Sequence, residues 1–413
     1  MRTFFLLFIT SISLWSLSID EAIERAMTHS PAIERAQSNM RYAASNELGA
    51  QAAFHPTLDA GYQWRDVDKT TAFSYSPAYN YNLTAKYNLF NGFADKATVN
   101  ARELETASQR LLLRAKQEDV ALDVVGAYTT YLKAKKAVQT QKDELSSLNR
   151  SYNDTKTRYE QGMIAKNELL LIDVDRLRAE QALVSAKSDI IRARDNLGRV
   201  IGVSLDRDES VNEISKKVNL VENIDILLER TIKNRSELRA LYKQKAALEE
   251  EYTVATGNFY PSVDLQGEYM VNDKSLQFGG STVQHKDQFA TTVNVSWNLY
   301  NGRSDEALRI GALEKVSGID ADIKAMKMDL QYQIIDAYEA YRTAKSAQDV
   351  ARRAKESAEE NFRITNDRYE YGQVDTLTLL KTQSDLTAAR NANNNAYYNL
   401  YMALASVKRV SGE

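Results

Sequence analysis

The feature that most constrains the fold is an internal repeat with a fixed spacing. The run Arg158–Gly162, Arg-Tyr-Glu-Gln-Gly, recurs 210 positions later as Arg368–Gly372, Arg-Tyr-Glu-Tyr-Gly. The same offset relates Phe90–Gly92 to Tyr300–Gly302. An offset that is kept over so long a stretch without an insertion indicates one structural unit that was duplicated and fused. The chain is therefore predicted to contain two copies of one fold.

Composition limits what these two copies can be. The 413 residues include only 16 glycines and 4 prolines, so long uninterrupted elements are expected. There is no cysteine, which excludes a thiol nucleophile, a disulfide framework, a zinc–cysteine site and a lipid-modified N-terminal cysteine. The 53 basic and 56 acidic residues nearly balance, so nothing points to nucleic acid.

Enzymatic chemistry has no recognisable motif in this chain. The three histidines, His29, His55 and His285, are scattered without the spacing of metal ligands. Neither a phosphate-binding glycine loop nor a nucleophile elbow is present. The sequence therefore predicts no enzyme, no cofactor and no metal site.

Residues 1–18 have the pattern of a signal peptide. Arg2 supplies the basic start, an apolar run follows up to Leu17, and the small residues Ser16 and Ser18 suit a cleavage before Ile19. The alternative is an anchored N-terminal helix, but the run is short for a bilayer span of about 20 residues. Export across the inner membrane is the expectation.

In each copy, the spacing of the apolar residues changes from a helical period to a strand period and back to a helical one. Asp20 is expected to cap the first helix, Pro31 opens a second, and apolar and polar residues alternate after Pro56. Repeat 1 (19–202) is predicted to contain helices 20–54, strands 57–66 and 79–90, a long helix 91–161 and a return helix 164–201. After a linker or equatorial segment, 203–223, repeat 2 (224–413) is predicted to contain helices 225–258, strands 262–272 and 288–300, a long helix 302–371 and a return helix 374–411.

The four predicted strands have about the length of a tilted strand that crosses a membrane, roughly 9–11 residues. Each has one apolar and one polar face, and aromatic residues suit the girdles of a membrane barrel. The candidates for this girdle are Tyr62, Trp64, Tyr87, Tyr269 and Trp297. Four strands cannot close a barrel, and unpaired edges cannot lie in lipid. The chain should therefore oligomerise, with eight strands in a dimer or twelve in a trimer.

The two long helices are predicted to form narrow coiled-coil seams, because apolar and small residues recur at three- and four-residue steps. Each would be about 100 Å long at 1.5 Å per residue, far more than a bilayer of about 30 Å. With an export signal, the helices would stand in the periplasm of a double-membraned bacterium. A coiled-coil scaffold protein without a pore, or a rod with exposed hairpins, is the alternative.

Several features in this order resemble the TolC-like outer membrane channel-tunnel family, the outer membrane efflux proteins. They are the Asp20…Ser30-Pro31 opening, Pro56 and Pro261 before strands, the junctions Leu89–Gly92 and Trp297–Gly302, and the paired Arg-Tyr-Glu-x-Gly turns. The resemblance covers about 19–412. It implies a mainly helical chain whose homotrimer forms a twelve-stranded β-barrel in the outer membrane and a twelve-helix α-barrel in the periplasm.

By the same resemblance, the function is that of a passive duct. The family implies docking to a periplasmic adaptor (membrane fusion) protein and to an inner-membrane pump of the RND or ABC class. The system would be a tripartite efflux pump, such as a multidrug exporter, or a type I secretion system. The sequence leaves the cargo open among drugs, metals, bile salts and proteins.

The resemblance also suggests a gate at the periplasmic end. Glu168 matches a family carboxylate after the first turn and Tyr369 a family tyrosine before the second, so a Glu168–Tyr369 hydrogen bond is the hypothesis. The alternative is that Tyr369 only fills the seam. Thr378 and Lys381 stand where relatives carry acidic residues, and with Asp385 they share one helical face. Asp375 lies nearby, and the sign of any charged ring is open.

The helix tips are the predicted adaptor contacts. They comprise Gln161, Gly162 and Met163 in the first copy and Tyr371, Gly372 and Gln373 in the second. The alternative is that the two glycines only cap helices, because glycine suits the left-handed conformation after a helix end.

Overall fold

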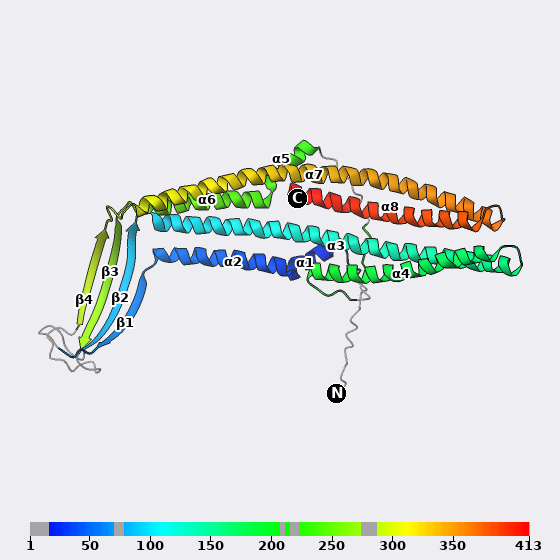
Figure 1. Ribbon diagram of the computed structural model, residues 1–413. Helices are drawn as coiled ribbons and strands as arrows, with labels where there is room; N and C mark the ends of the chain where they lie inside the picture. Colours follow the sequence, from blue (N-terminus) through cyan, green and yellow to red (C-terminus); the bar gives the residue numbers. More distant parts are fainter. Residues whose placement is uncertain (1–15, 70–77, 207–210, 215–222, 274–286, 413) are drawn as a thin grey trace, which may run out of the picture. The chain divides into compact units, whose positions relative to one another are not determined.

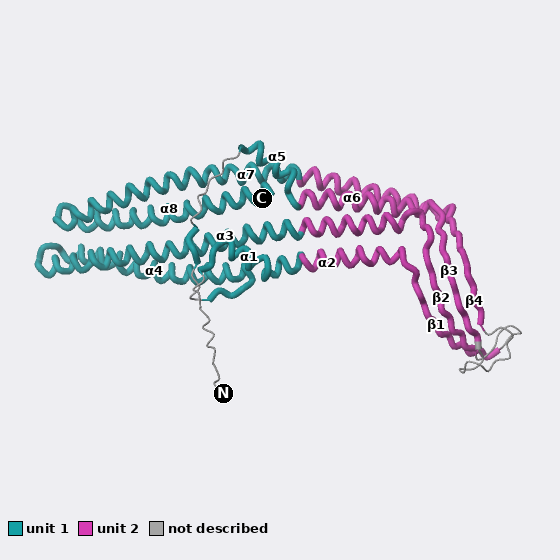
Figure 2. Tube along the Cα trace, turned by 180° about the vertical axis from the view of Figure 1, so that it is seen from behind, with its two compact units in different colours: residues 1–36, 113–236, 327–413 teal, residues 37–112, 237–326 magenta. Residues whose placement is uncertain are grey.

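The computed structural model describes residues 16–69, 78–206, 211–214, 223–273 and 287–412 (Figure 1). Most of the predicted signal peptide, 1–15, lies outside the described residues. The chain forms two compact units (Figure 2). The first comprises 1–36, 113–236 and 327–413, and the second comprises 37–112 and 237–326.

Both repeats have the same order of elements. Repeat 1 consists of α1 (Ile19–His29), α2 (Pro31–Gln51), the short η1 (Ala52–Phe54), β1 (Thr57–Arg65), β2 (Ala78–Asn91), α3 (Ala94–Glu160) and α4 (Lys166–Ile201). Repeat 2 consists of α5 (Ile224–Asn234), α6 (Ser236–Gly257), β3 (Ser262–Asp273), β4 (Asp287–Ser296), α7 (Ser304–Glu370) and α8 (Thr376–Ser411). None of the helices in the described ranges is both long and apolar enough to span a bilayer.

The N-cap of the first helix lies two residues before the expected one. Ser18, and not Asp20, is the N-cap of α1, because its hydroxyl accepts the Glu21 N–H at 3.2 Å while the Glu21 carboxylate reaches back to the Ser18 N–H at 3.5 Å. This reciprocal capping box satisfies two backbone donors that a helix start leaves open. A cleavage before Ile19 would remove this cap.

The core of the first unit gathers around Tyr128 of α3, which is 1% exposed. Its hydroxyl lies 2.9 Å from the Leu17 carbonyl and 2.8 Å from the Asn212 carbonyl. Burial raises the pKa of Tyr128 above its ordinary value. Leu17 is fully buried and forms a parallel bridge with Val211, so the segment before α1 and part of the predicted linker belong to this core.

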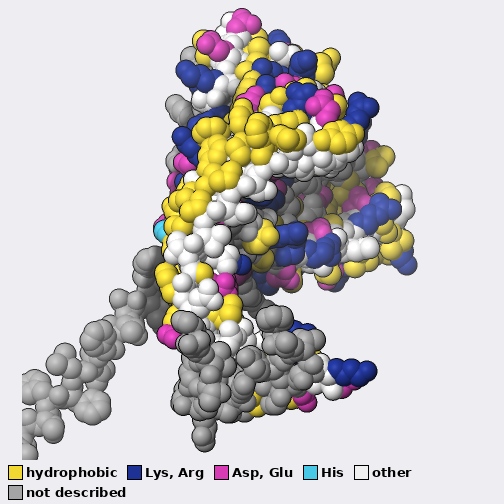
Figure 3. Space-filling model, turned by 90° about the vertical axis from the view of Figure 1, so that its left-hand side faces the viewer, with side chains coloured by type: hydrophobic (Ala, Val, Ile, Leu, Met, Phe, Trp, Pro, Cys, Tyr) yellow, Lys and Arg dark blue, Asp and Glu magenta, His cyan; other side chains and the backbone are white. Residues whose placement is uncertain are grey.

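The second unit carries an antiparallel sheet in the order β1-β2-β3-β4. The register pairs Tyr62 with Tyr81, and Leu83 with both Ala60 and Tyr269. Because side chains alternate along a strand, the aromatic and aliphatic residues fall on one face and the amides and charges on the other. The apolar face is uncovered, and Figure 3 shows a band of hydrophobic side chains along the sheet. Its exposed members include Leu58, Tyr62, Trp64, Leu83, Tyr269, Phe289, Val293 and Val295.

One strand is shorter than its alternation suggested. The predicted strand 288–300 ends at Ser296, although Trp297 and Leu299 continue the pattern. Ser296 pairs with Ser262, the first residue of β3, and Pro261 precedes it. Beyond Ser296 the strand has no partner to pair with, because proline offers no backbone N–H.

Candidate gate at the helix tips

The two helical hairpins end in the same turn. Gly162 and Gly372 have φ of +71° and +67°, a region that residues with a side chain rarely adopt. The N–H groups of Met163 and Gln373 donate to the carbonyls of Arg158 and Arg368, each at 2.9 Å. These bonds satisfy carbonyls at the helix ends, as in a Schellman C-cap. The recurrence of the glycine in both copies is therefore explained by capping.

The side chains of the predicted tips face outwards. Met163 is 70% exposed and Tyr371 is 81% exposed, and both Gln161 and Gln373 are also exposed. Large apolar side chains at this exposure offer a surface that another protein can cover. The tips are thus accessible, as a docking surface must be.

A buried hydroxyl cluster joins the two tips. Tyr369 at the end of α7 is 6% exposed, and its hydroxyl lies 2.8 Å from that of Thr155 on α3 and 3.4 Å from that of Thr376 on α8. Thr376 in turn donates to the Glu168 carboxylate on α4 at 2.8 Å. Glu168 and Tyr369 are therefore linked through Thr376 and not by the direct bond that was expected. The reason is that Thr376, in the first turn of α8, points its short hydroxyl between them.

Arg158 is a second member of this cluster that the sequence analysis missed. Its guanidinium donates to the Tyr369 carbonyl at 3.1 Å and to the Glu370 carbonyl at 2.9 Å. Its Cζ also lies 4.9 Å from the centre of the Tyr369 ring. A cation at the last carbonyls of a helix is stabilising, and the ring face adds a cation–π contact. The presence of an arginine in both copies of the turn was the available signal.

The candidate pore residues of α8 occupy one uncovered face. Thr378, Lys381 and Asp385 are exposed, whereas the neighbouring positions Leu379, Leu380, Thr382, Gln383 and Leu386 are buried. Asp375 has a different position, because it is the N-cap of α8 and accepts the Thr378 N–H at 2.8 Å. Hydrogen bonds from the Thr378 side chain and backbone hold the pKa of Asp375 below its ordinary value.

The girdle candidates are divided among three levels of the sheet. Trp64 and Tyr62 lie near the C-terminal end of β1, and Tyr87 lies near the C-terminal end of β2, which precedes α3. Tyr269 lies at mid-strand, because it pairs with Leu83 opposite Ala60. Trp297 lies beyond β4, and its indole N–H donates to the Phe259 carbonyl at 3.1 Å.

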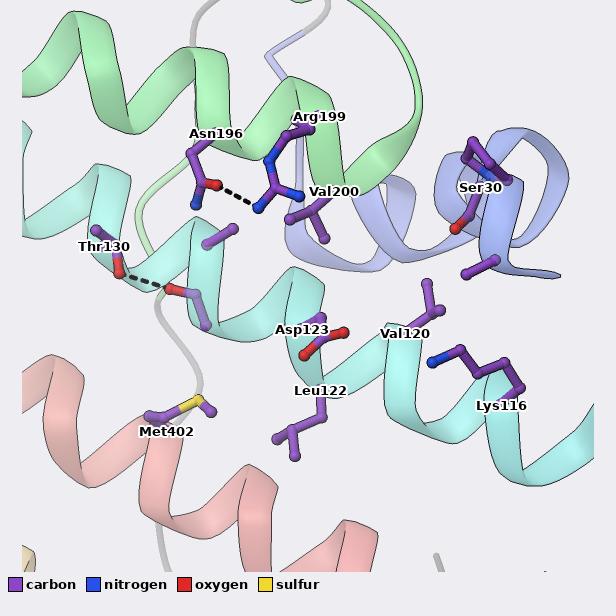
Figure 4. A pocket seen from close by; sticks show the side chains of 14 residues that line it. Ser30, Lys116, Val120, Leu122, Asp123, Thr130, Asn196, Arg199, Val200 and Met402 are labelled. Carbon is purple, nitrogen blue, oxygen red and sulfur yellow. Dashed lines mark hydrogen bonds between the residues drawn. The ribbon is translucent and has the colours of Figure 1, made fainter.

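The first unit also contains a cavity of about 620 Å³ between the α1–α2 junction, α3, α4 and α8 (Figure 4). Polar side chains such as Lys116, Asp123 and Arg199 line it. Arg199 donates to the Asn196 side chain at 2.8 Å. In the part of the chain that the structure describes, no cluster of three histidine, aspartate or glutamate side chains could hold a metal ion.

Known proteins are similar to this chain in sequence or in fold. Protein CyaE of Bordetella pertussis is 23% identical over 381 residues, which cover 91% of this chain and 79% of CyaE. The CmeC outer membrane channel of Campylobacter jejuni has a TM-score of 0.83 at 16% identity, with 95% of this chain and 85% of that chain covered. The outer membrane protein VceC of Vibrio cholerae has a TM-score of 0.79 at 19% identity, with 95% and 96% covered.

A family model for outer membrane efflux proteins matches both repeats, over 22–203 and 227–413. These ranges take in both helical tips and all four strands. The resemblance inferred from the paired turns is therefore confirmed, and so is the two-repeat, mainly helical fold class. The chain belongs to the outer membrane efflux protein family, and its location is the outer membrane.

Proposed function

We propose that three copies of this chain form the outer-membrane exit duct of a tripartite efflux or type I secretion system. The observation that carries the proposal is the four-stranded sheet of the second unit. Its apolar face is uncovered, and its order leaves β1 and β4 at the two edges. Strand edges cannot remain unpaired in lipid, so β4 of one copy should pair with β1 of the next. Three copies then give one closed barrel of twelve strands.

The duct is passive in this proposal and has no catalytic chemistry of its own. Energy and choice of cargo come from an inner-membrane pump of the RND or ABC class. A periplasmic adaptor protein joins that pump to the duct. The exposed tip residues Met163 and Tyr371, with Gln161 and Gln373 beside them, are the proposed adaptor contacts. This assignment is supported by the exposure of their side chains and by their position at the ends of both hairpins.

The cluster around Tyr369 is the proposed latch of the closed state. It joins the hairpin of repeat 1, through Thr155 and Glu168, to the hairpin of repeat 2, through Tyr369 and Thr376. A hydrogen bond to a charged group contributes about 1.5–3 kcal/mol, so three copies of the latch can hold a pore closed. Opening requires the two hairpins to separate at this point.

The uncovered face of α8 is the proposed lining of the narrow end. Thr378, Lys381 and Asp385 would place a hydroxyl, a cation and an anion in each copy of the ring. Because the two charges have opposite sign, we expect a weaker ion preference than a ring of carboxylates alone would have. The reversal potential of single channels under a salt gradient measures this preference, and strong cation selectivity would contradict the expectation.

The deciding experiment for the duct is the mass of the detergent-extracted protein, corrected for bound detergent, followed by conductance in a planar bilayer. We expect three chains and discrete channels. A stable monomer recovered from the soluble periplasm would contradict the duct and favour a coiled-coil scaffold without a pore.

A further inference from the structure

We infer that Asn301 is a site of spontaneous deamidation, and that the equivalent Asn91 is protected from the same reaction by its surroundings. Asn91-Gly92 and Asn301-Gly302 are the two Asn-Gly pairs of the sequence. Each stands at the junction between a strand and a long helix, the first between β2 and α3 and the second between β4 and α7. The duplication therefore places a reactive pair and its internal control in every chain.

The reaction is an attack of a backbone nitrogen on the preceding side chain. The Gly302 nitrogen gives up its proton and forms a bond to Cγ of Asn301, while the bond from Cγ to the amide nitrogen breaks and that nitrogen leaves as ammonia with the proton. The product is a five-membered cyclic imide. Water then opens the ring at one of its two carbonyls, which leaves aspartate or isoaspartate at position 301. Glycine favours the closure because it has no side chain to obstruct the nitrogen.

Hydrogen bonds hold the side chain of Asn91 at the first junction. Its amide nitrogen donates to the Asp95 carboxylate at 2.8 Å, and its amide oxygen accepts the Asp95 N–H at 3.1 Å. Asn91 is also the last residue of β2 and pairs with Ser262 of β3. The Asn91 amide would have to leave Asp95 before its Cγ could approach the Gly92 nitrogen, so these bonds oppose the reaction.

The second junction has only part of this support. The amide oxygen of Asn301 accepts the Asp305 N–H at 3.3 Å, but within the described ranges its amide nitrogen forms no hydrogen bond. Strand β4 ends at Ser296, so Asn301 lies outside the ladder that holds Asn91. Asn301 is exposed, whereas Asn91 is half-buried. Its leaving group is thus free of the bond that retains the equivalent group of Asn91.

The two glycines differ in the same direction. Gly92 is buried, and a methyl group added to its Cα would lie 2.3 Å from the carbonyl oxygen of Gly257 at the end of α6. Gly302 is exposed, and the same methyl group would meet no described atom within 4 Å. Their φ values are similar, +66° and +70°, so the local backbone conformation does not distinguish them. Packing against α6 therefore restricts the peptide unit before Gly92, and no comparable contact restricts the one before Gly302.

Aromatic contacts add to the cover of the first junction. The Phe90 ring lies 5.1 Å from that of Phe93, which in turn lies 6.2 Å from the ring of Tyr260. At the second junction, Tyr300 takes the place of Phe90 and is 78% exposed, and an exposed Arg303 takes the place of Phe93. Water, which the second step of the reaction consumes, thus has easier access to Asn301.

The two products differ in their effect on α7. The amide oxygen of Asn301 accepts a backbone N–H in the first turn of this helix. An aspartate keeps such an acceptor and adds a negative charge near the positive end of the helix dipole. An isoaspartate directs the main chain through Cγ and moves the acceptor away, so that one N–H of the first turn loses its partner. Isoaspartate at position 301 should therefore weaken the start of α7, and aspartate should not.

The test is a comparison of both sites in one sample. The detergent-extracted protein is incubated at mildly alkaline pH, and peptide mass mapping follows the conversion of amide to acid at Asn301 and at Asn91. Labelling by an isoaspartyl methyltransferase detects the isoaspartate. We expect conversion at Asn301 to be at least about tenfold faster, because Asn91 reacts only after a local opening of its bonds and packing. In protein unfolded by denaturant, the two rates should become similar.

Equal rates at the two sites of the folded protein would overturn the inference. So would the absence of conversion at Asn301 under conditions in which the unfolded protein reacts at both sites. A difference that persists in denaturant would also contradict it, because the cause would then be the neighbouring sequence and not the structure.

Three variants locate the cause. Asp95→Ala should raise the rate at Asn91 severalfold, whereas the matched Asp305→Ala should leave the rate at Asn301 nearly unchanged, because no bond joins the Asp305 carboxylate to the Asn301 amide in the described ranges. An unchanged rate at Asn91 in Asp95→Ala would overturn the protective role of that bond. Asn301→Ser cannot form the imide and should abolish the methyltransferase labelling of the folded protein, and labelling that survives this substitution would contradict the assigned site.

Discussion

Tyr62 and Trp64 in the sheet of the second unit leave 55% and 57% of their surface exposed, whereas Tyr128 and Tyr398 in the first unit are 1% and 2% exposed. The residue type is similar, but the surroundings differ. In the first unit, the ring and the hydroxyl are both satisfied by the same chain. In the sheet, the described residues cover less than half of each of these two side chains, although the Tyr62 ring lies 5.1 Å from that of Tyr81. In the proposed duct, lipid covers the rest. The comparison shows that a single chain buries the tyrosines of its first unit but leaves the apolar face of its sheet exposed.

The largest expected effect is a difference in stability between arginine substitutions on the two faces of the sheet. Val293 and Thr292 are neighbours on β4, and their side chains point to the apolar and the polar face. We expect Val293→Arg to destabilise the membrane-inserted protein by about 2–4 kcal/mol, because a charge on a lipid-facing strand must leave water. The matched variant Thr292→Arg should cost far less. Heat stability of the extracted oligomer and its yield in the outer membrane measure both, and equal losses would contradict a lipid-facing assignment.

The second prediction concerns the core. Tyr128→Phe removes the hydroxyl that contacts the Leu17 and Asn212 carbonyls. We expect a loss of about 1–3 kcal/mol in stability of the first unit, because the Asn212 carbonyl loses the hydroxyl donor, whereas the Leu17 carbonyl still accepts the Asn212 N–H at 2.9 Å. The control is Tyr338→Phe at the equivalent position of repeat 2, which is only partly buried. Denaturant unfolding measures the difference, and similar losses for both variants would contradict the special position of Tyr128.

The stability of the protein at alkaline pH should depend on Tyr128 and on the neighbouring buried Tyr398. Burial raises the pKa of Tyr128 and of Tyr398 above the ordinary value near 10. Above pH 10 the unfolded chain would release these protons while the folded chain keeps them, so stability should fall as the pH rises further. Tyr128→Phe should show a smaller alkaline loss than the unchanged protein. An identical alkaline loss in both would show that Tyr128 does not contribute to it.

Removing a hydroxyl from the proposed latch should change the conductance of the channel more than the folding of the chain. Thr376→Val keeps the shape of the side chain but removes the hydroxyl between Tyr369 and Glu168. We expect a loss of about 1.5–3 kcal/mol per latch and a larger single-channel conductance. The control Thr157→Val, at an exposed position of α3 near the same tip, should leave the latch closed. If both variants conduct like the unchanged protein, the latch does not hold the pore.

The smallest effect belongs to the N-terminal cap. Ser18→Ala should cost about 1 kcal/mol, because α1 loses a side-chain cap. A signal cleavage before Ile19, as the sequence predicts, would remove the buried Leu17 and the capping Ser18, whereas a cleavage upstream of Leu17 would keep both. The intact mass of the mature chain decides this point, since a chain that begins at Ile19 would lack both residues.

Local sequence patterns determined much of this protein. The offset of 210 residues, the change of period after Pro56 and the glycines at the tips depend on neighbouring residues or on the duplication. They led to the two repeats, the sheet with one apolar face and the helical hairpins, and the family followed from their order. Such features are readable because helix and strand periods arise from backbone geometry that is the same in every protein.

Only the tertiary structure decided the contacts between distant parts. Thr376 lies between Glu168 and Tyr369 because α8 packs beside α4 at the tips. Arg158 contacts the end of α7, and β4 stops where its partner β3 begins. Leu17 is in the core because Tyr128 and Val211 surround it. Apart from the β3–β4 pairing, these outcomes depend on side chains that meet across more than a hundred residues of chain, and no local period encodes such contacts.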